Sequence, residues 1–122
     1  MRVKDAVGKF GEDVAVAHLE RAGVRVLARN WRCREGELDI VARDGDVLVF
    51  CEVKTRSGTS FGSPAEAVTS VKGERLRTLA ARWLCEEDDG RAATECSTIR
   101  FDVVGVVRGR DGVSVEHLRG VL

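Results

Sequence analysis

Apolar and small residues recur at helical spacing in two segments of the chain. In the first segment Gly8 and Gly11 share one face, and we expect a helix over residues 5–22 with Asp5 as its N-cap and Gly23 at its C-terminal end. Glycine destabilises a helix interior by about 1 kcal/mol. Two glycines on one face therefore predict that this helix closely approaches another element.

A capping motif as well as an apolar stripe predicts the second helix. The segment Ser63-Pro64-Ala65-Glu66 combines a serine N-cap, a proline at the first helical position and a glutamate three residues after the serine. We expect this helix to continue to about Cys85. Its apolar stripe consists of Val68, Leu76, Leu79, Ala80, Trp83 and Leu84.

Alternating or continuous apolar positions predict five strands. They cover residues 24–28, 37–42, 46–54, 99–107 and 113–118. Asp44-Gly45 is a typical two-residue hairpin turn between the second and third strands, and a turn over 109–112 joins the last two. The order of elements, α-β-β-β-α-β-β, predicts an α/β fold of one domain over 1–122, with a central mixed five-stranded sheet flanked by helices.

Composition excludes several classes of protein. Hydrophobic residues make up 43% of the 122 residues and charged residues 33%, which is typical of a soluble globular domain. No apolar run approaches a membrane span or a signal peptide, so we expect no membrane association and a cytoplasmic location. The four cysteines lack C-x-x-C spacing and are expected to be reduced thiols, and the two histidines lie far apart, which argues against a zinc site.

The net charge argues against a simple electrostatic DNA-binding protein. Lys+Arg and Asp+Glu are both 20, whereas such proteins are usually strongly basic. The distribution is less even, because residues 21–34 contain five arginines and no acidic residue. This segment permits a local basic surface, although a solvated face is the more common meaning of a run of like charges.

The predicted hairpin gathers acidic side chains. In the expected register Glu37 lies opposite Glu52, and Asp39 lies opposite Phe50. Since side chains alternate with period two, one face carries Glu37, Asp39, Glu52 and Lys54. The other face carries Leu38, Ile40, Ala42, Val47, Val49, Cys51 and Val53. Opposed carboxylates repel unless a cation lies between them, which favours Mg²⁺ or Mn²⁺ over the alternative of a solvated face neutralised by Lys54.

An acidic residue on one strand followed by Glu-x-Lys on the next resembles the core of PD-(D/E)xK nucleases with the restriction-endonuclease-like fold. Leu38 stands where the proline of that motif is expected. The longer blocks resemble the bacterial YraN-type family, whose members are named as endonucleases by similarity to archaeal Holliday-junction resolvases. These blocks are Gly8-x-x-Gly11-Glu12-x-x-Ala15, Arg29-Asn30-Trp31-Arg32, Gly36-Glu37-Leu38-Asp39-Ile40, Phe50-x-Glu52-Val53-Lys54-Thr55-Arg56, Phe61-Gly62-x-Pro64 and Arg100-Phe101-Asp102-Val103-Val104.

The resemblance implies a role for each matching residue. Asp39 and Glu52 would bind Mg²⁺ or Mn²⁺, with the backbone carbonyl of Val53 as a further ligand. Glu12 from the first helix would complete the acidic cluster, and Lys54 would orient the attacking water and stabilise the phosphate in the transition state. Glu37 belongs to the same block as Asp39 and is a further candidate ligand.

Nucleic-acid contacts are expected from a separate set of side chains. They are Arg29, Trp31, Arg32, Arg34, Arg56, Lys72 and Arg75, with the arginines on flanking phosphates and Trp31 either stacking on a base or packing in the core. Lys72 lies on the apolar stripe of the second helix and is equally consistent with a surface lysine whose stem lies along the apolar surface.

These features favour a metal-dependent endonuclease that acts on branched, flapped or single-stranded DNA in repair or recombination, close to the nucleoid. The selectivity is expected to depend on DNA structure, because no residue in the pattern is suited to reading base edges. By analogy with resolvases, a homodimer is expected. Two alternatives stay open, namely a nucleic-acid-binding or assembly module that keeps the nuclease fold without turnover, and an unrelated protein-interaction domain.

Overall fold

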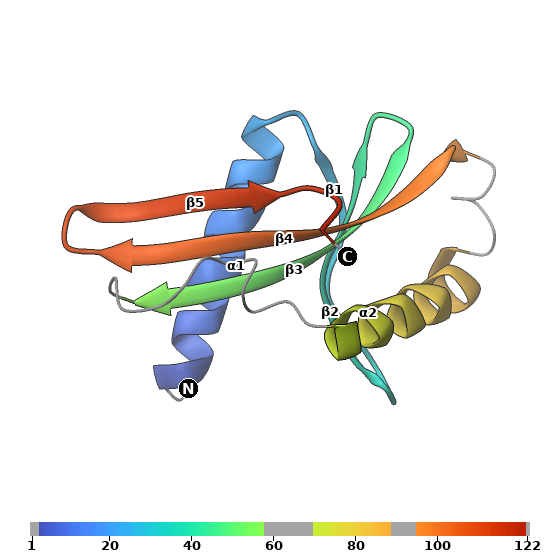
Figure 1. The fold of residues 1–122 in the computed structure, drawn as a ribbon, viewed down its shortest axis with the longest axis horizontal. Coiled ribbons are helices and arrows are strands. Elements are labelled where there is room, and N and C mark those ends of the chain that lie inside the picture. The colour runs from blue at the N-terminus through green and yellow to red at the C-terminus, as the bar shows by residue number, and fades with distance from the viewer. Residues whose placement is uncertain (1–2, 58–69, 89–94, 122) are drawn as a thin grey trace.

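The computed structural model describes residues 3–57, 70–88 and 95–121 and contains two helices, a π-helical turn and five strands in this part of the chain (Figure 1). The elements are α1 (Val3–Arg21), β1 (Arg25–Cys33), β2 (Gly36–Asp44), β3 (Val47–Ser57), α2 (Ser70–Trp83), the π-helical turn η2 (Leu84–Asp88), β4 (Thr98–Gly109) and β5 (Gly112–Leu118).

The five strands form one mixed sheet in the order β1-β2-β3-β4-β5. Only β3 and β4 run parallel, and the other neighbouring pairs are antiparallel. Parallel neighbours need a long crossover, and the segment that contains α2 provides it. The predicted α/β fold and its order of elements, α-β-β-β-α-β-β, are confirmed.

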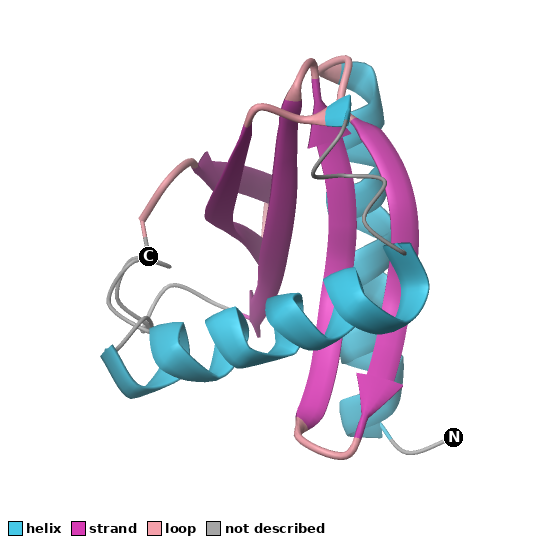
Figure 2. Ribbon diagram, turned by 90° about the vertical axis from the view of Figure 1, so that its right-hand side faces the viewer, coloured by secondary structure: helices cyan, strands magenta, loops and turns pink. Residues whose placement is uncertain are grey.

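The two helices cover opposite faces of the sheet. Apolar residues of α1, such as Ala15 and Leu19, pack against one face, and Leu76, Leu79 and Trp83 of α2 pack against the other. Figure 2 shows α2 in front of the strands and α1 behind them. On the α2 side, Phe50 contacts Trp83 edge-to-face with ring centroids 5.9 Å apart. In the described part of the chain, neither helix is long and apolar enough to cross a bilayer.

Several predicted boundaries are wrong by a few residues. α1 begins at Val3, so Asp5 lies inside the helix and is not its N-cap, whereas Gly23 has the positive φ of 87° expected at the C-terminal end. The first strand continues to Cys33, and β3 continues to Ser57. The capping motif over 63–66 lies outside the described residues. α2 ends at Trp83, before the predicted Cys85.

The first hairpin turn lies one residue later than predicted. Asp44 pairs with Val47, so Gly45 and Asp46 form the turn, and Gly45 has the positive φ of 63°. Val41, rather than Asp39, therefore lies opposite Phe50. A glycine at the first central position satisfies the positive φ that such turns require, which explains why the Asp-Gly pattern alone misplaced the turn.

Candidate functional site

The alternation of side chains is interrupted where β1 and β2 pass each other. Arg29 pairs with Ile40 and Trp31 pairs with Leu38, which leaves Asn30 and Asp39 between the two pairs. Asn30 has a φ of 53°, in the left-handed region that few non-glycine residues adopt. The strict period of two therefore fails at this position.

The cores on the two faces show the consequence of this interruption. Leu38 and Val41 both pack on the α2 side, although they are three residues apart, whereas Ile40 packs on the α1 side. The prediction that Leu38 shares a face with Ile40 is wrong. Asp39 lies at the crossing between the faces and lines cavities on both of them.

Asp39 also lies where the paired part of β2 and β3 ends. The last paired residues are Ile40 and Cys51, and the same register continued by one position places Asp39 opposite Glu52. The backbone N–H of Val53 donates to Asp39 Oδ2 at 2.8 Å. The Asp39 side chain thus accepts a hydrogen bond from β3 beyond the paired segment, and this fixes its carboxylate between the separating strands.

Three carboxylates converge at this point. One oxygen each from Glu12 of α1 and from Glu37 and Asp39 of β2 lie within 4.8 Å of one another. Glu12 Oε1 is buried without a hydrogen-bond partner, and Nη2 of Arg29 lies 3.9 Å away. The Glu12 side chain is only 13% exposed, so its carboxylate is largely removed from solvent.

Burial and mutual repulsion disfavour the ionised forms of these acids. The pKa of Asp39 is raised to about 6, mainly by burial and also by the charges of Glu52, Glu12 and Glu37, while the hydrogen bond from Val53 opposes the rise. Burial likewise raises the pKa of Glu12, although the Arg29 guanidinium opposes this shift. A cation among the carboxylates would relieve both the desolvation and the repulsion.

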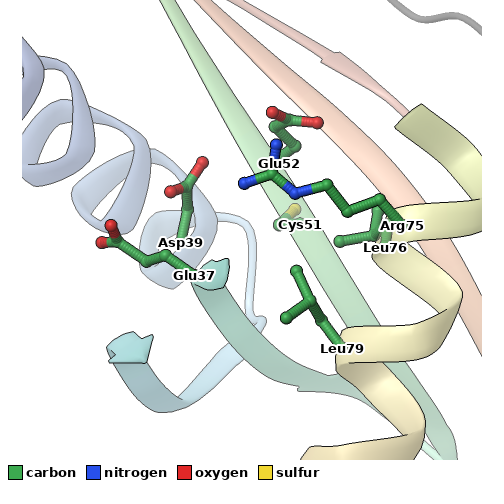
Figure 3. Close-up of a pocket in the computed structure, with 7 residues that line it drawn as sticks. All are labelled: Glu37, Asp39, Cys51, Glu52, Arg75, Leu76 and Leu79. Atoms are coloured by element: carbon green, nitrogen blue, oxygen red, sulfur yellow. The ribbon is translucent and has the colours of Figure 1, made fainter. Parts of the chain in front are cut away.

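Glu52 and Lys54 lie beside this cluster and not within it. Glu52 lines a cavity of about 30 Å³ together with Glu37 and Asp39, which is room for a water molecule or a single ion (Figure 3). Lys54 Nζ lies 3.9 Å from Glu52 Oε1. Lys54 also lines a groove of about 430 Å³ on the α1 side, together with Glu12 and Asp39. The four hairpin residues are therefore neighbours around one site, although Asp39 departs from the strict alternation on which their common face was predicted.

The residues present fit a hard divalent cation. The donor set consists of carboxylate oxygens, and it includes the buried, unpartnered Oε1 of Glu12. Glu12, Glu37 and Asp39 would hold the ion, with Glu52 next to them across the cavity. The backbone N–H of Val53 holds the Asp39 side chain in position through its hydrogen bond. That the backbone carbonyl of Val53 binds the metal stays a prediction.

The residues expected to contact nucleic acid are distributed around this site. Arg29 forms an ion pair with Asp13, and Arg32 lies 3.5 Å from a Glu37 oxygen with 79% of its side chain exposed. Trp31 packs against the core on the α2 side, as its alternative role predicted. The remaining candidates are Arg34, which is exposed, Arg56, which lines the α1-side groove, Arg75, which lines the acidic cavity, and Lys72, whose side chain lies outside the described residues.

Asp102 was singled out in the sequence only as a member of the block Arg100-Phe101-Asp102-Val103-Val104. Asp102 is completely buried, and its carboxylate accepts hydrogen bonds from Arg100 at 2.9 and 3.0 Å and from the backbone N–H of Gly120 at 2.9 Å. Nε2 of His117 lies 2.7 Å from the same carboxylate. An aspartate within the apolar run of β4 was the available signal, because a buried acid requires partners.

A second group of metal-binding residue types surrounds Asp102, but its chemistry does not fit an ion. Atoms of Cys51, Asp102 and His117 lie within 4.8 Å of one another. Both Asp102 oxygens already have partners. Burial, together with the Asp102 charge, raises the pKa of the Cys51 thiol, so the thiolate that a metal needs is disfavoured. This group is a structural network.

Comparison with known proteins places the chain among bacterial relatives of similar length. Residues 11–106 match the model of the uncharacterised protein family UPF0102. A UPF0102 protein of Frankia alni is 62% identical over 121 residues, which cover 98% of this chain and 97% of the relative. UPF0102 proteins of Frankia casuarinae and Beutenbergia cavernae are 60% and 58% identical, over 98% and 99% of both chains.

Proposed function

This chain belongs to the UPF0102 family, and we propose that it is a divalent-metal-dependent endonuclease that hydrolyses DNA phosphodiester bonds. The observation that carries the proposal is the convergence of Glu12, Glu37 and Asp39 within 4.8 Å, with Glu52 and Lys54 beside them. Repelling, partly buried acids lower the stability of the fold, so their convergence is explained best by a cation that they bind.

Each residue of the chain has a defined task in this proposal. When bound, Mg²⁺ or Mn²⁺ would lower the pKa of a coordinated water and neutralise charge on the phosphate. Asp39, held by the Val53 N–H, and Glu12, fixed on α1, provide a preformed set of oxygen ligands. Lys54 would place a positive charge beside the phosphate oxygens in the transition state. Glu52 restrains that ammonium group at 3.9 Å.

The surroundings of the site support selectivity for DNA structure. The groove of about 430 Å³ beside Glu12 and Asp39 is also lined by Lys54 and Arg56, whose positive charges suit backbone phosphates, and phosphate contacts carry no base-sequence information. Branched, flapped or single-stranded DNA presents extended strands, and repair or recombination is the setting in which they arise.

The proposal is tested by incubating the purified protein with Mn²⁺ on flapped, four-way-branched and linear DNA. Asp39→Asn, Glu12→Gln and Lys54→Ala are each expected to lower the cleavage rate by about 10²–10⁴-fold, because each removes a ligand charge or the transition-state cation. Asp13→Asn serves as the matched control, because Asp13 is adjacent to Glu12 on α1 but half-exposed.

Metal-dependent cleavage that persists in Asp39→Asn and Lys54→Ala would contradict the proposal. Salt-sensitive DNA binding without cleavage, weakened more by Arg32→Ala than by Asp39→Asn, would instead identify a binding module that retains the fold.

A further inference from the structure

Arg75 extends from α2 into the acidic site. It lines the cavity formed by Glu37, Asp39 and Glu52, and Figure 3 shows its side chain reaching across from the helix toward these acids. Its guanidinium lies over Gly36 at the start of β2. A Cβ at Gly36 would come within 2.9 Å of Arg75 Nη2 and 3.2 Å of Nε, so the glycine provides the space in which the guanidinium lies.

Arg75 forms no hydrogen bond or ion pair within the described part of the chain. Other arginines are paired with carboxylates there, among them Arg29, Arg32, Arg43, Arg82 and Arg100. A guanidinium has five N–H donors arranged for bidentate contact with a carboxylate or a phosphate. The N–H donors of Arg75 lie beside the acidic cavity and have no acceptor among the described residues of the protein.

A second groove lies next to Arg75 on the side of the β1–β2 connection. It has a volume of about 400 Å³ and is lined by Arg32 near the end of β1, by Arg34 on the β1–β2 connection, by Gly36 and Glu37, and by Arg75. The charge of Glu35, which also lines this groove, is matched by Arg82 at 2.7 Å. Gly36, Glu37 and Arg75 border the groove, and two of them, Glu37 and Arg75, also line the acidic cavity. The two spaces are therefore adjacent.

We propose that Arg75, together with Arg32 and Arg34, forms a subsite for the backbone phosphate next to the one that is hydrolysed. This inference rests on the proposed nuclease function and adds the path of the substrate strand. The cleaved phosphate must lie at the carboxylates, and the strand then passes over Gly36 between α2 and the β1–β2 connection. The substrate class that follows is an oligonucleotide strand, in preference to an isolated phosphodiester.

The test compares two substrates that differ in whether a neighbouring phosphate is present. Bis(p-nitrophenyl) phosphate has one phosphodiester only, and a flapped DNA oligonucleotide has a phosphate on each side of the cut. For Arg75→Ala, the ratio of kcat/KM for the oligonucleotide to that for the small diester is expected to fall about 10- to 100-fold, because a bidentate phosphate contact is lost. Arg75→Lys should recover part of this ratio.

Arg77→Ala is the matched control, because Arg77 is exposed on the same helix and lies over the Phe101 ring, 5.7 Å from its centroid. It removes the same charge from α2 and is expected to change the ratio less than twofold.

In a second measurement, one neutral methylphosphonate replaces the phosphate beside the cut. For the unmodified protein, this replacement should lower kcat/KM by the same factor as Arg75→Ala lowers it on the ordinary oligonucleotide. For the Arg75→Ala variant, the same replacement should lower kcat/KM little further.

The outcomes separate this inference from the proposed function. A proportional loss on both substrates, an equal effect of Arg77→Ala, or additive losses from Arg75→Ala and the methylphosphonate would overturn the subsite. Absence of metal-dependent turnover by the unmodified protein on both substrates would refute the proposed function itself.

Discussion

Asp39 is the residue at which stability and the proposed function oppose each other. Its carboxylate is mostly buried, faces three other acids and has a pKa raised to about 6, from an ordinary value of 3.8. In the unfolded chain the same group ionises near its ordinary pKa. Folding therefore binds a proton more tightly at this site, and above pH 6 the folded protein holds an ionised group that its surroundings disfavour.

Replacement of Asp39 by asparagine is therefore expected to stabilise the metal-free protein. The amide oxygen still accepts the Val53 N–H, and the charge penalty, at most about 3 kcal/mol for a shift of this size, is removed. The gain should be absent near pH 3, should grow between about pH 4 and 6, and should be complete above that range. Urea unfolding in the presence of EDTA over this pH range measures it.

Asp13→Asn is the control. Because the contact with Arg29 lowers the pKa of Asp13, the ionised form is favoured there, and no gain in stability is expected from its replacement. With Mn²⁺ present, the unmodified protein should gain thermal stability, whereas Asp39→Asn should not. A destabilised Asp39→Asn at pH 7 would show that burial does not penalise this charge.

At the scale of elements, the position of Glu12 depends on how closely α1 approaches β3. Gly11 is buried against β3, where an added Cβ would overlap the Thr55 side chain, with Thr55 Cβ at 2.8 Å. The next residue, Glu12, thereby reaches Asp39 and Glu37. Gly8 lies one turn earlier on the same helix and has no atom within 4 Å of the corresponding position.

The two glycines are expected to respond in opposite directions to the same substitution. Gly11→Ala should destabilise the protein by about 1–3 kcal/mol, because the helix must move away from β3. Gly8→Ala should stabilise it by about 0.5–1 kcal/mol, because alanine is the better helix former and the space is open. Denaturant unfolding of the two variants measures these changes in the free energy of unfolding. Changes of the same sign and size in both variants would contradict the close contact between Gly11 and β3.

At the scale of the whole molecule, the Asp102 network ties together segments that are distant in sequence. Arg100 connects Asp102 of β4 with Asp44 at the end of β2, His117 belongs to β5, and Gly120 follows β5. Burial alone would raise the pKa of Asp102, but the hydrogen bonds from His117, Arg100 and Gly120 together lower it. The carboxylate is thus stabilised in its ionised form.

Asp102→Asn is expected to lower the free energy of unfolding by about 3–5 kcal/mol at pH 7, because it removes one partner of a buried charge pair. The pKa of Asp102 is lower in the folded protein than in the unfolded chain. The stabilisation by its ionised carboxylate is therefore fully present above the ordinary pKa of 3.8 and is lost as the pH falls through the lowered pKa of the folded protein. The pH dependence is opposite in sign to that of Asp39→Asn.

Urea unfolding between about pH 3 and 7 tests the network. Asp44→Asn is the control, because Asp44 is partly exposed and contributes a single ion pair to Arg100, for which a loss of at most about 1 kcal/mol is expected. An Asp102→Asn variant as stable as the control would show that the network is not a stabilising element.

The class and order of the elements followed from the amino-acid sequence alone, and membership of the UPF0102 family followed from the match of residues 11–106 to the family model. Strand periodicity also identified Glu37, Asp39, Glu52 and Lys54 as the candidate site, because residue types and periodicity are local properties, and the resemblance added Glu12. The membership of the carboxylate cluster was decided only by the tertiary structure. The Asn30 conformation and the end of β2–β3 pairing remove Asp39 from strict alternation, and they bring Glu37 rather than Glu52 close to Glu12.

Tertiary structure also decided the partners of Asp102 and the position of Arg75 over Gly36. These contacts join residues from different elements, and their geometry depends on helix placement, on twist and on one left-handed residue. Periodicity along a single strand contains no information about such distances, since they arise only when the elements pack against one another.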